Sequence, residues 1–215
     1  MISHPLLIFD LDGTLVEFPR DYIFSQTDRI LAELGHPPVT AEEMLHAFCL
    51  FDFFSFVQDP NRKEFIDRYW RSFDWVNYPK PSPLEGAASV LAELKQRGHT
   101  LALATARLDP VAELRDCLLA TGFLDHLDHL ECRPGEHVEW TDKTGHIDRI
   151  CRKFGVSPQQ AVFVGDIPAD VKSAKLAGVG VTVAVLSGGI YRSVLEAAEP
   201  DHILDDVRHL LTLGF

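Results

Sequence analysis

Short apolar runs alternate with helical patterns from about residue 80 to the end of the 215-residue chain, and this alternation limits the fold more than any other feature. An earlier apolar run, Pro5 to Phe9, has the pattern of a buried strand. Strands that alternate with helices require right-handed crossovers, and they form a mostly parallel sheet with helices on both faces. The sequence therefore predicts an α/β protein with a doubly wound, Rossmann-like sheet.

The elements of this sheet can be bounded from apolar runs, caps and glycines. We expect strands at residues 5–9, 99–105, 127–132, 161–166, 180–186 and 202–205, and helices at 82–98, 110–122, 143–155, 169–178 and 206–213. The helix at 82–98 begins with the sequence SPLE. In it, serine is expected to cap the helix, proline to occupy the first position and glutamate to complete a capping box.

Residues 17–80 do not follow this alternation and are predicted to be all-helical. We expect helices at 21–35, 40–57 and 61–73. The second should begin with a capping box between Thr40 and Glu43, and the proline-rich stretch YPKPSP marks the return to the sheet. The sequence thus predicts one domain made of residues 1–16 and 81–215, with a smaller helical domain inserted after its first strand.

The composition is that of a globular protein, with 46% hydrophobic residues and a formal net charge of −12. Lysine and arginine form no cluster long enough to indicate a nucleic-acid partner. The N-terminus has no signal-peptide pattern, and the most apolar segment, FCLFDFFSFV, is about half as long as a membrane helix. Four separated cysteines fit reduced thiols. We therefore expect a cytoplasmic monomer or homodimer without a nucleic-acid or membrane partner.

Polar residues stand directly after several predicted strands, where open parallel sheets bind their ligands. Asp10 and Asp12 follow the first strand, Thr105 ends the second, and Gly165 and Asp166 end a later one. Because alternate residues of an extended chain point the same way, the first two aspartates can face one small volume. These residues are far apart in the sequence, so their convergence at one edge of the sheet predicts a functional site.

The acidic residues among them predict a metal site. Asp10, Asp12, Asp166 and Asp170 can bring three or four carboxylates into one pocket. Hard oxygen ligands of this kind suit Mg²⁺, which usually binds a substrate phosphate as well. A metal ion would also reverse the repulsion between an acidic pocket and a phosphate.

Neutral and basic residues complete the predicted phosphate site. Gly13 permits a sharp exit from the first strand and a close approach of the backbone to a ligand, and Thr14 adds a hydroxyl group. Thr105 and Lys143 would supply a hydrogen bond and a fixed positive charge for the phosphoryl oxygens that are not transferred.

Together these motifs resemble the haloacid dehalogenase superfamily of phosphotransferases. The resemblance rests on DLDGT, a strand-terminal Thr105, Lys143 and GDIPAD in the family's order, and it covers the whole sheet domain. The helical insertion resembles the family's cap, placed after the first strand as in phosphoglycolate phosphatase-like and β-phosphoglucomutase-like members. Dehalogenating members generally lack the second aspartate, so Asp12 favours phosphoryl transfer over dehalogenation.

The resemblance implies a role for each acidic residue. Asp10 would attack phosphorus and become an aspartyl-phosphate. Asp12 would protonate the leaving oxygen and then activate the water that hydrolyses the intermediate. The carboxylates of Asp10 and Asp166, with the backbone carbonyl of Asp12, would hold Mg²⁺. Asp170 would support the waters of the metal or the side chain of Lys143.

The resemblance also implies which residues bind the phosphoryl group: Gly13, Thr14, Thr105, Ala106 and Lys143. Two positions depart from the family pattern. Relatives often have asparagine where this chain has Ala106, which Arg107 follows, and they often have a proline after the lysine that corresponds to Lys143. Neither departure removes a catalytic group.

The sequence therefore predicts a Mg²⁺-dependent phosphatase for a small phosphorylated metabolite, with a catalytic core and a helical cap that selects the substrate. A sugar-phosphate mutase of the β-phosphoglucomutase type remains open, because the residues around the phosphoryl group would be the same. From another class, non-catalytic phospho-acceptor modules also combine paired acids, threonine, lysine and Mg²⁺ on a doubly wound sheet. They use an aspartate on a later strand and have no helical insertion of this size.

Two further patterns are interpreted as structural. The spacing of His126, His129 and Cys132 is that of a transition-metal set, but in a strand residues three apart point to opposite faces, so we do not predict a zinc site. The aromatic run at 48–56 is expected to pack inside the helical domain, with the lining of a substrate pocket as the alternative.

Overall fold

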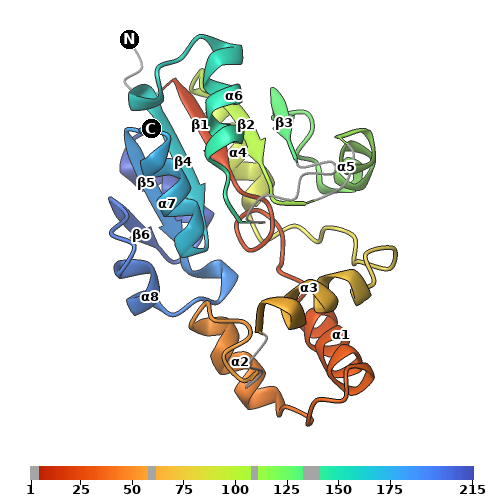
Figure 1. The fold of residues 1–215 in the computed structure, drawn as a ribbon. Coiled ribbons are helices and arrows are strands. Elements are labelled where there is room, and N and C mark those ends of the chain that lie inside the picture. Colours follow the sequence, from red (N-terminus) through yellow and green to blue (C-terminus); the bar gives the residue numbers. More distant parts are fainter. Residues whose placement is uncertain (1–4, 58–61, 108–110, 133–140) are drawn as a thin grey trace. The chain divides into compact units, whose positions relative to one another are not determined.

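The computed structural model describes residues 5–57, 62–107, 111–132 and 141–215. The chain divides into two compact units, which are Met1–Phe18 together with Pro81–Phe215, and Pro19–Lys80. We call the first the core unit and the second the helical unit. Their helices and strands are labelled in Figure 1.

The core unit is built on a six-stranded sheet in which all neighbouring strands are parallel (Figure 1). The strands are β1 (Leu6–Phe9), β2 (Thr100–Ala104), β3 (His129–Glu131), β4 (Ala161–Gly165), β5 (Val181–Val185) and β6 (His202–Leu204). Their order is β3-β2-β1-β4-β5-β6, so the chain runs from β1 to one edge and then crosses to the other side of β1. The predicted doubly wound parallel sheet is confirmed, and its topological switch point lies between β1 and β4.

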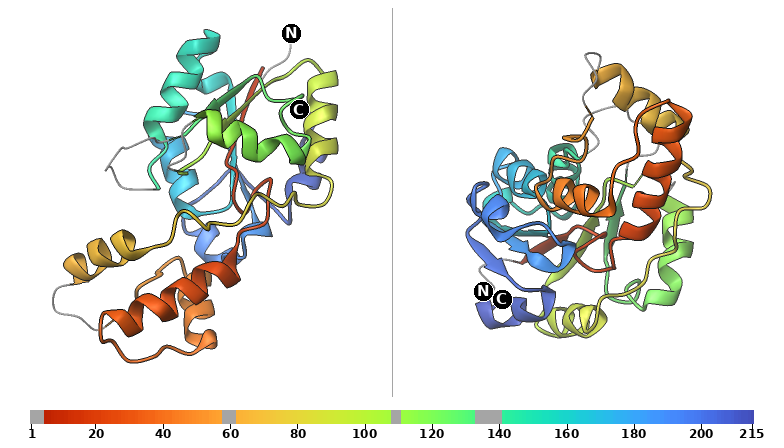
Figure 2. Two further views of the ribbon diagram at one scale, coloured as in Figure 1. Left: turned by 90° about the vertical axis from the view of Figure 1, so that its right-hand side faces the viewer. Right: turned by 90° about the horizontal axis from the view of Figure 1, so that it is seen from below.

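Helices cover both faces of this sheet (Figure 2). The helices described in the core unit are α4 (Ala87–Gln96), α5 (Val111–Leu118), α6 (Thr144–Phe154), α7 (Pro168–Leu176) and α8 (Arg192–Glu196), with 3₁₀ turns at Leu119–Thr121, Pro158–Gln160, Leu186–Gly188 and Val207–Leu213. In β1, Leu7 and Phe9 belong to the cluster that includes α4 and α5, whereas Leu6 and Ile8 belong to the cluster that includes α6 and α7. The strands are continuous apolar runs because both of their faces are buried.

In the part of the helical unit that the structure describes there are three helices, α1 (Arg20–Glu33), α2 (Ala41–Cys49) and α3 (Arg62–Ser72). The predicted capping box at the start of α2 is present. The Glu43 N–H donates to Thr40 Oγ1 at 3.2 Å, and the Thr40 N–H donates to Glu43 Oε2 at 2.9 Å. Residues 61 and 110, where two predicted helices were expected to begin, lie outside the described residues.

Aromatic rings pack inside the helical unit. The ring of Phe48 contacts that of Phe53, and the ring of Phe54 lies edge-on against Phe65 and Tyr69, with centroids 6.0 and 4.9 Å apart. Phe48 and Phe54 are both buried. For these members of the aromatic run, the prediction that they form the packing of the helical insertion is confirmed.

The start of α4 was predicted wrongly. The helix expected at 82–98 begins at Ala87, after Gly86. The preceding segment is extended because it pairs with the chain that leaves β1: Val16 and Pro83 form an antiparallel bridge. Two further backbone hydrogen bonds, from Glu17 N–H to Ser82 O and from Leu84 N–H to Leu15 O, join the same segments. A tertiary contact thus overrides the local signal for a capping box.

The second helix of the helical unit is shorter than predicted. It was expected to extend to residue 57 but ends at Cys49. Phe51 has a positive φ of 55°, and the Asp52 N–H donates to Ala47 O at 3.0 Å. This arrangement ends a helix because a left-handed residue turns the chain back onto the carbonyls of the last turn.

The C-terminal helix is of a different type from the one predicted. Residues 206–213 were expected to form an α-helix, and the structure has a 3₁₀ helix at Val207–Leu213. The Asp206 carboxylate caps it by accepting the Arg208 N–H at 2.8 Å. The tighter winding still buries Val207 and Leu210 in the cluster that includes α4.

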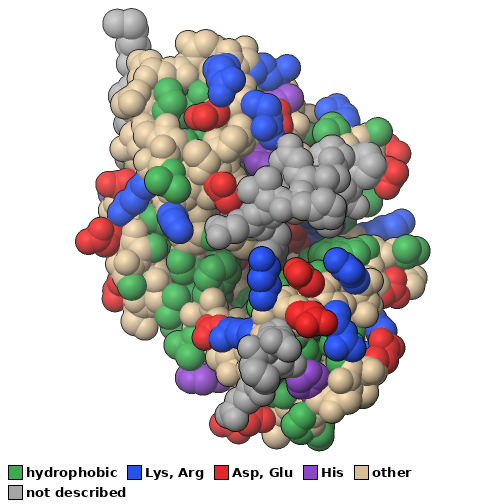
Figure 3. Space-filling model, in the orientation of Figure 1, with side chains coloured by type: hydrophobic (Ala, Val, Ile, Leu, Met, Phe, Trp, Pro, Cys, Tyr) green, Lys and Arg blue, Asp and Glu red, His purple; other side chains and the backbone are tan. Residues whose placement is uncertain are grey.

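Charged side chains of both signs are interspersed over the face of the molecule shown in Figure 3. Within the described ranges, no helix has both the length and the apolar character needed to cross a membrane. No disulfide joins the four cysteines, all of which lie within the described residues, and three of them are buried.

Candidate active site

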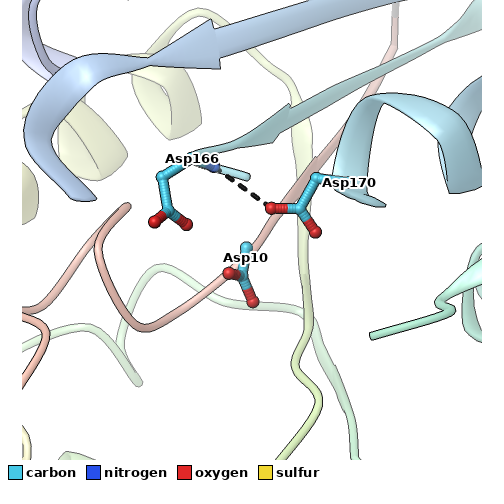
Figure 4. Close-up of side chains that lie close together, drawn as sticks. All are labelled: Asp10, Asp166 and Asp170. Atoms are coloured by element: carbon cyan, nitrogen blue, oxygen red, sulfur yellow. Dashed lines mark hydrogen bonds between the residues drawn. The ribbon is translucent and has the colours of Figure 1, made fainter. Parts of the chain in front are cut away.

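Three carboxylates from distant parts of the chain meet at the carboxyl ends of β1 and β4 (Figure 4). Asp10 directly follows β1, Asp166 directly follows β4, and Asp170 lies in the first turn of α7. One oxygen atom from each lies within 4.8 Å of the others. All three residues are buried, with exposed fractions of 5%, 3% and 0%.

Strand pairing explains how these residues come together. Phe9 of β1 is in register with Val164 of β4, and the Asp10 N–H continues the ladder by donating to Val164 O at 2.9 Å. Asp10 and Asp166 therefore leave neighbouring strands at nearly the same level. The switch point of the sheet makes this the expected place for a ligand site.

Asp170 organises the turn between β4 and α7. Its Oδ2 accepts the backbone N–H groups of Asp166 and Ile167 at 3.1 and 3.3 Å. A carboxylate at this position also complements the partial positive charge at the start of α7. Asp170 thus holds in place the backbone that carries Asp166.

Lys143 provides the positive charge of the cluster. Its ammonium group lies 2.7 Å from Asp10 Oδ1 and 2.6 Å from Asp170 Oδ1, and the residue is 1% exposed. Its backbone N–H donates to Ser173 Oγ of α7 at 3.0 Å, which positions the residue immediately before α6. Among the described residues, Lys143 is the one cation paired with carboxylates of this cluster, those of Asp10 and Asp170, so the cluster has an excess of acidic groups.

The pKa values of the cluster reflect first its burial and then this excess of acidic groups. Burial, followed by the charge of Asp170, raises the pKa of Asp10 to about 7, although Lys143 opposes the shift. Burial and the charges of Asp10 and Asp170 raise the pKa of Asp166 well above its usual range. For Lys143, burial lowers the pKa, but the two neighbouring carboxylates outweigh it and hold this pKa above its ordinary value. A buried acidic cluster of this kind favours a bound cation.

Two glycines leave room for Asp166. A β carbon at Gly13 would come within 2.2 Å of Asp166 Oδ2, and one at Gly188 would come within 1.8 Å of the same atom. Gly13 also has a φ of 82°, a conformation that other residues rarely adopt. On the same side chain, Thr14 Oγ1 donates to Asp166 Oδ1 at 3.2 Å.

The loop after β5 was missed by the sequence analysis. Ser187 Oγ donates to the Gly13 carbonyl at 2.6 Å, and Gly188 lies against Asp166. A signal was available, since both residues directly follow the strand predicted at 180–186 and so stand at the same edge of the sheet as the aspartates.

Asp12 lies outside the carboxylate cluster that could hold a metal ion. Its carboxylate is paired with Arg107, whose Nε donates to Oδ2 at 2.8 Å and whose Nη2 donates to Oδ1 at 2.6 Å. The sequence analysis noted Arg107 only beside a departure from the family pattern, because the pair links residues 95 positions apart. The role implied for Asp12 in metal binding uses its backbone carbonyl and not this side chain.

Thr105 lies at the end of the strand next to β1, which Asp10 follows. It follows β2, which is the neighbour of β1, and it is buried. Its backbone N–H donates to Glu131 O at 3.0 Å, and its Oγ1 accepts the Arg107 N–H at 3.2 Å. Ala106 lies between Thr105 and Arg107 and is half-buried.

The histidine and cysteine pattern for which no zinc site was predicted lies elsewhere. In it, His129 lies 3.0 Å from the carboxylate of Glu131.

The donor set fits a magnesium ion. Carboxylate oxygens are the ligands that this hard cation prefers, and the cluster contains no nitrogen or sulfur donor of a transition-metal site. Burial is the largest cause of the raised pKa values of Asp10 and Asp166, and the charges of their acidic neighbours raise them further.

Comparison with known proteins agrees with this geometry. Residues 7–184 match the family model described as haloacid dehalogenase-like hydrolase. Phosphoglycolate phosphatase from Pasteurella multocida is 33% identical over 99% of this chain and 99% of its own length. Phosphoglycolate phosphatase from Pseudomonas putida is 30% identical over 96% of this chain and 78% of its own length.

Solved structures share the fold. A haloacid dehalogenase-like family protein from Streptococcus pneumoniae has a TM-score of 0.76 at 20% identity, and a predicted phosphoglycolate phosphatase from Haemophilus somnus has 0.72 at 22% identity. Each alignment covers 100% of both chains.

Three findings define the class of protein: the α/β fold, the cluster of carboxylates at its switch point, and the family model that matches most of the chain. The chain belongs to the haloacid dehalogenase-like hydrolases, and within them it is a phosphatase similar to the phosphoglycolate phosphatases. The family resemblance predicted from the sequence is confirmed. The alternative of a non-catalytic phospho-acceptor module is not supported.

Proposed function

We propose that the protein hydrolyses a small phosphate monoester in two steps, with Asp10 as the nucleophile and Mg²⁺ as the cofactor. The observation that carries this proposal is the position of Asp10, buried at the switch point with Lys143 at 2.7 Å and Asp166 in the same cluster of carboxylates. A nucleophile in such a place is held beside a fixed positive charge and a cation site, which are the two groups that a transferring phosphoryl group needs.

In the first step, an Asp10 oxygen forms a bond to phosphorus while the bond from phosphorus to the leaving oxygen breaks. The electron pair goes to the leaving oxygen, which takes a proton from Asp12. In the second step, water gives a proton to Asp12 and bonds to phosphorus, and the bond to Asp10 breaks, which restores its carboxylate.

The other residues would orient the phosphoryl group and neutralise its negative charge. Lys143 would bind the phosphoryl oxygens together with Thr105, Ala106, Gly13 and Thr14. The carboxylates of Asp10 and Asp166 and the backbone carbonyl of Asp12 would hold Mg²⁺, with Asp170 in support. When bound, the ion supplies positive charge that offsets the carboxylates and the developing charge on phosphorus.

The helical unit would act as a cap. It is inserted between Phe18 and Pro81, and so follows β1 and Asp10 in the chain. A cap placed there would select the substrate and exclude water during the first step. A chain whose cap is held by an engineered crosslink and which still turns over at the full rate would contradict this role.

The substrate class is proposed from the relatives. Two of them, at 30% and 33% identity, are named phosphoglycolate phosphatases, and another, from Pseudomonas aeruginosa at 26% identity, is named N-acetylmuramic acid 6-phosphate phosphatase. We therefore propose a small phosphorylated metabolite as the substrate, with phosphoglycolate as the first to assay, and the cytoplasm as the site of action.

The test is the release of inorganic phosphate from a panel of phosphorylated metabolites, with Mg²⁺ and with a chelator, for the wild type and for Asp10→Asn. We expect Mg²⁺-dependent release by the wild type and a loss of at least about 10³-fold in the variant. The exposed Asp205→Asn serves as the matched control and should retain activity. Equal release by the wild type and Asp10→Asn would show that Asp10 is not the nucleophile.

A further inference from the structure

The pair between Arg107 and Asp12 is unlike the other arginine pairs of the chain. Both of its hydrogen bonds, at 2.8 and 2.6 Å, join the guanidinium to the two oxygens of one carboxylate. The side chains are 10% and 15% exposed, and no other arginine–carboxylate pair within the described residues is buried to this extent on both sides. A two-bond fork fixes the plane of the carboxylate as well as its position.

The strand ends explain why Arg107 lies next to Asp12. It lies two residues beyond Thr105 at the end of β2, and Asp12 lies two residues beyond Asp10 at the end of the neighbouring β1. The Arg107 N–H donates to Thr105 Oγ1 at 3.2 Å, which turns the chain directly after the strand. The pair therefore connects two strand ends across the edge of the sheet where the site lies.

We propose that Arg107 is the positioning residue for Asp12, holding its carboxyl group in the orientation from which it transfers a proton to the leaving oxygen. The proposal rests on the proposed function, in which Asp12 has that role. Arginine keeps its proton under all ordinary conditions, so Arg107 does not itself supply the proton. Its contribution is orientation, and a displacement of about 1 Å in a reacting group can cost on the order of 100-fold in rate.

Leaving groups that differ in their need for a proton provide the test. An alkyl leaving group needs protonation as its bond to phosphorus breaks, whereas p-nitrophenolate is stable as an anion. We expect Arg107→Ala to lower kcat/KM for the best alkyl phosphate of the panel by about 10- to 100-fold. With p-nitrophenyl phosphate, kcat/KM should fall by less than about 3-fold. Inhibition by inorganic phosphate, which has no leaving group, should stay the same.

Two further variants make the result specific. Arg208 forms a pair of the same geometry with Asp206, at 3.0 and 2.8 Å, elsewhere in the core unit. Arg208→Ala should therefore leave the ratio of the two kcat/KM values unchanged. Arg107→Lys keeps the charge but not the fork, and it should restore part of the alkyl phosphatase activity. If circular dichroism shows that Arg107→Ala is unfolded, Arg107→Lys is judged by the same ratio.

Three results would overturn the proposal. These are an equal loss with both substrates, a rise in KM for the alkyl phosphate with kcat unchanged, and a gain in kcat, which would mean that Arg107 restrains Asp12 instead of placing it. The proposed function fails separately, because it depends on the comparison of the wild type with Asp10→Asn and not on the choice of leaving group.

Discussion

Gly188 lies so close to Asp166 that a β carbon at position 188 would come within 1.8 Å of Asp166 Oδ2. The φ of Gly188 is not in the left-handed region, so the backbone conformation does not require a glycine there. The three atoms that its β carbon would approach most closely all belong to the Asp166 side chain. The loop after β5 therefore shapes the candidate metal site although it contributes no charged group to it.

Gly188→Ala should displace the Asp166 carboxylate and leave the chain folded. We expect at least a tenfold loss of apparent Mg²⁺ affinity, measured from the Mg²⁺ dependence of phosphate release, because metal ligands tolerate little displacement. Gly145→Ala is the matched control, since Gly145 also has an ordinary φ and its β carbon would approach only the end of the Arg149 side chain, at 3.4 Å. Unchanged Mg²⁺ dependence in Gly188→Ala would contradict the proposed position of the ion.

Lys143→Met should destabilise the core unit in the absence of Mg²⁺. Removing one partner of a buried ion pair leaves uncompensated carboxylates, which costs about 3–5 kcal/mol in the free energy of unfolding. Urea denaturation with a chelator measures this loss, and repeating it with Mg²⁺ should recover part of it. Lys95→Met is the control, because its pair with Asp128 is about one-third exposed and should be worth less than about 1 kcal/mol. Equal losses in the two variants would refute the expectation.

Removal of Mg²⁺ should lower the thermal stability of the wild type. An ion that binds only the folded state stabilises it by about 2.7 kcal/mol at 100 times its dissociation constant, which raises the melting temperature by several degrees. The melting temperature with Mg²⁺ and with a chelator gives the measurement. Asp166→Asn should lose the difference, whereas the exposed Asp205→Asn should keep it. A wild-type melting temperature that does not respond to Mg²⁺ would be evidence against the site.

The helical unit should lose stability at alkaline pH through Tyr69. Burial raises the pKa of Tyr69 to about 12, although its hydrogen bond with Thr27 opposes the shift. The unfolded chain loses this proton near pH 10, so the stabilising effect is complete below about pH 10 and disappears as the pH rises to about 12. Urea denaturation across this range should show the loss in the wild type and in Thr27→Val, which keeps the phenol buried. It should be smaller in Tyr69→Phe, and a loss of the same size in that variant would exclude Tyr69 as its source.

Much of the core unit was predictable because its signals are local. The strand at residues 5–9 is a continuous apolar run, and Asp10 and Asp12 interrupt it at the point where the structure ends β1. Asp166 follows β4 in the same way. The capping box of Thr40 and Glu43 formed as expected, since all of its hydrogen bonds lie within four residues.

The features that the sequence did not predict have a common cause. The SPLE segment has the local pattern of a helix start, but its backbone pairs with the chain around Val16, which is more than 60 residues away. The pair of Arg107 with Asp12 and the contact of Gly188 with Asp166 likewise join distant segments. A signal from periodicity or capping has no information about such contacts, because it extends over a few residues only.

The order of apolar runs and helical patterns was enough to determine the α/β class, and the acidic residues after the strands were enough to predict a phosphate-directed metal site. Both follow from the short-range preferences of the chain and from the rule that parallel strands present their carboxyl ends at one edge. The resemblance left open whether Asp170 supports the waters of the metal or Lys143, and the tertiary structure pairs it with Lys143, which also contacts Asp10. The tertiary structure alone decided that Arg107 pairs with Asp12. Those contacts depend on the register of neighbouring strands and on the loops between them, where fractions of an ångström determine which side chains meet.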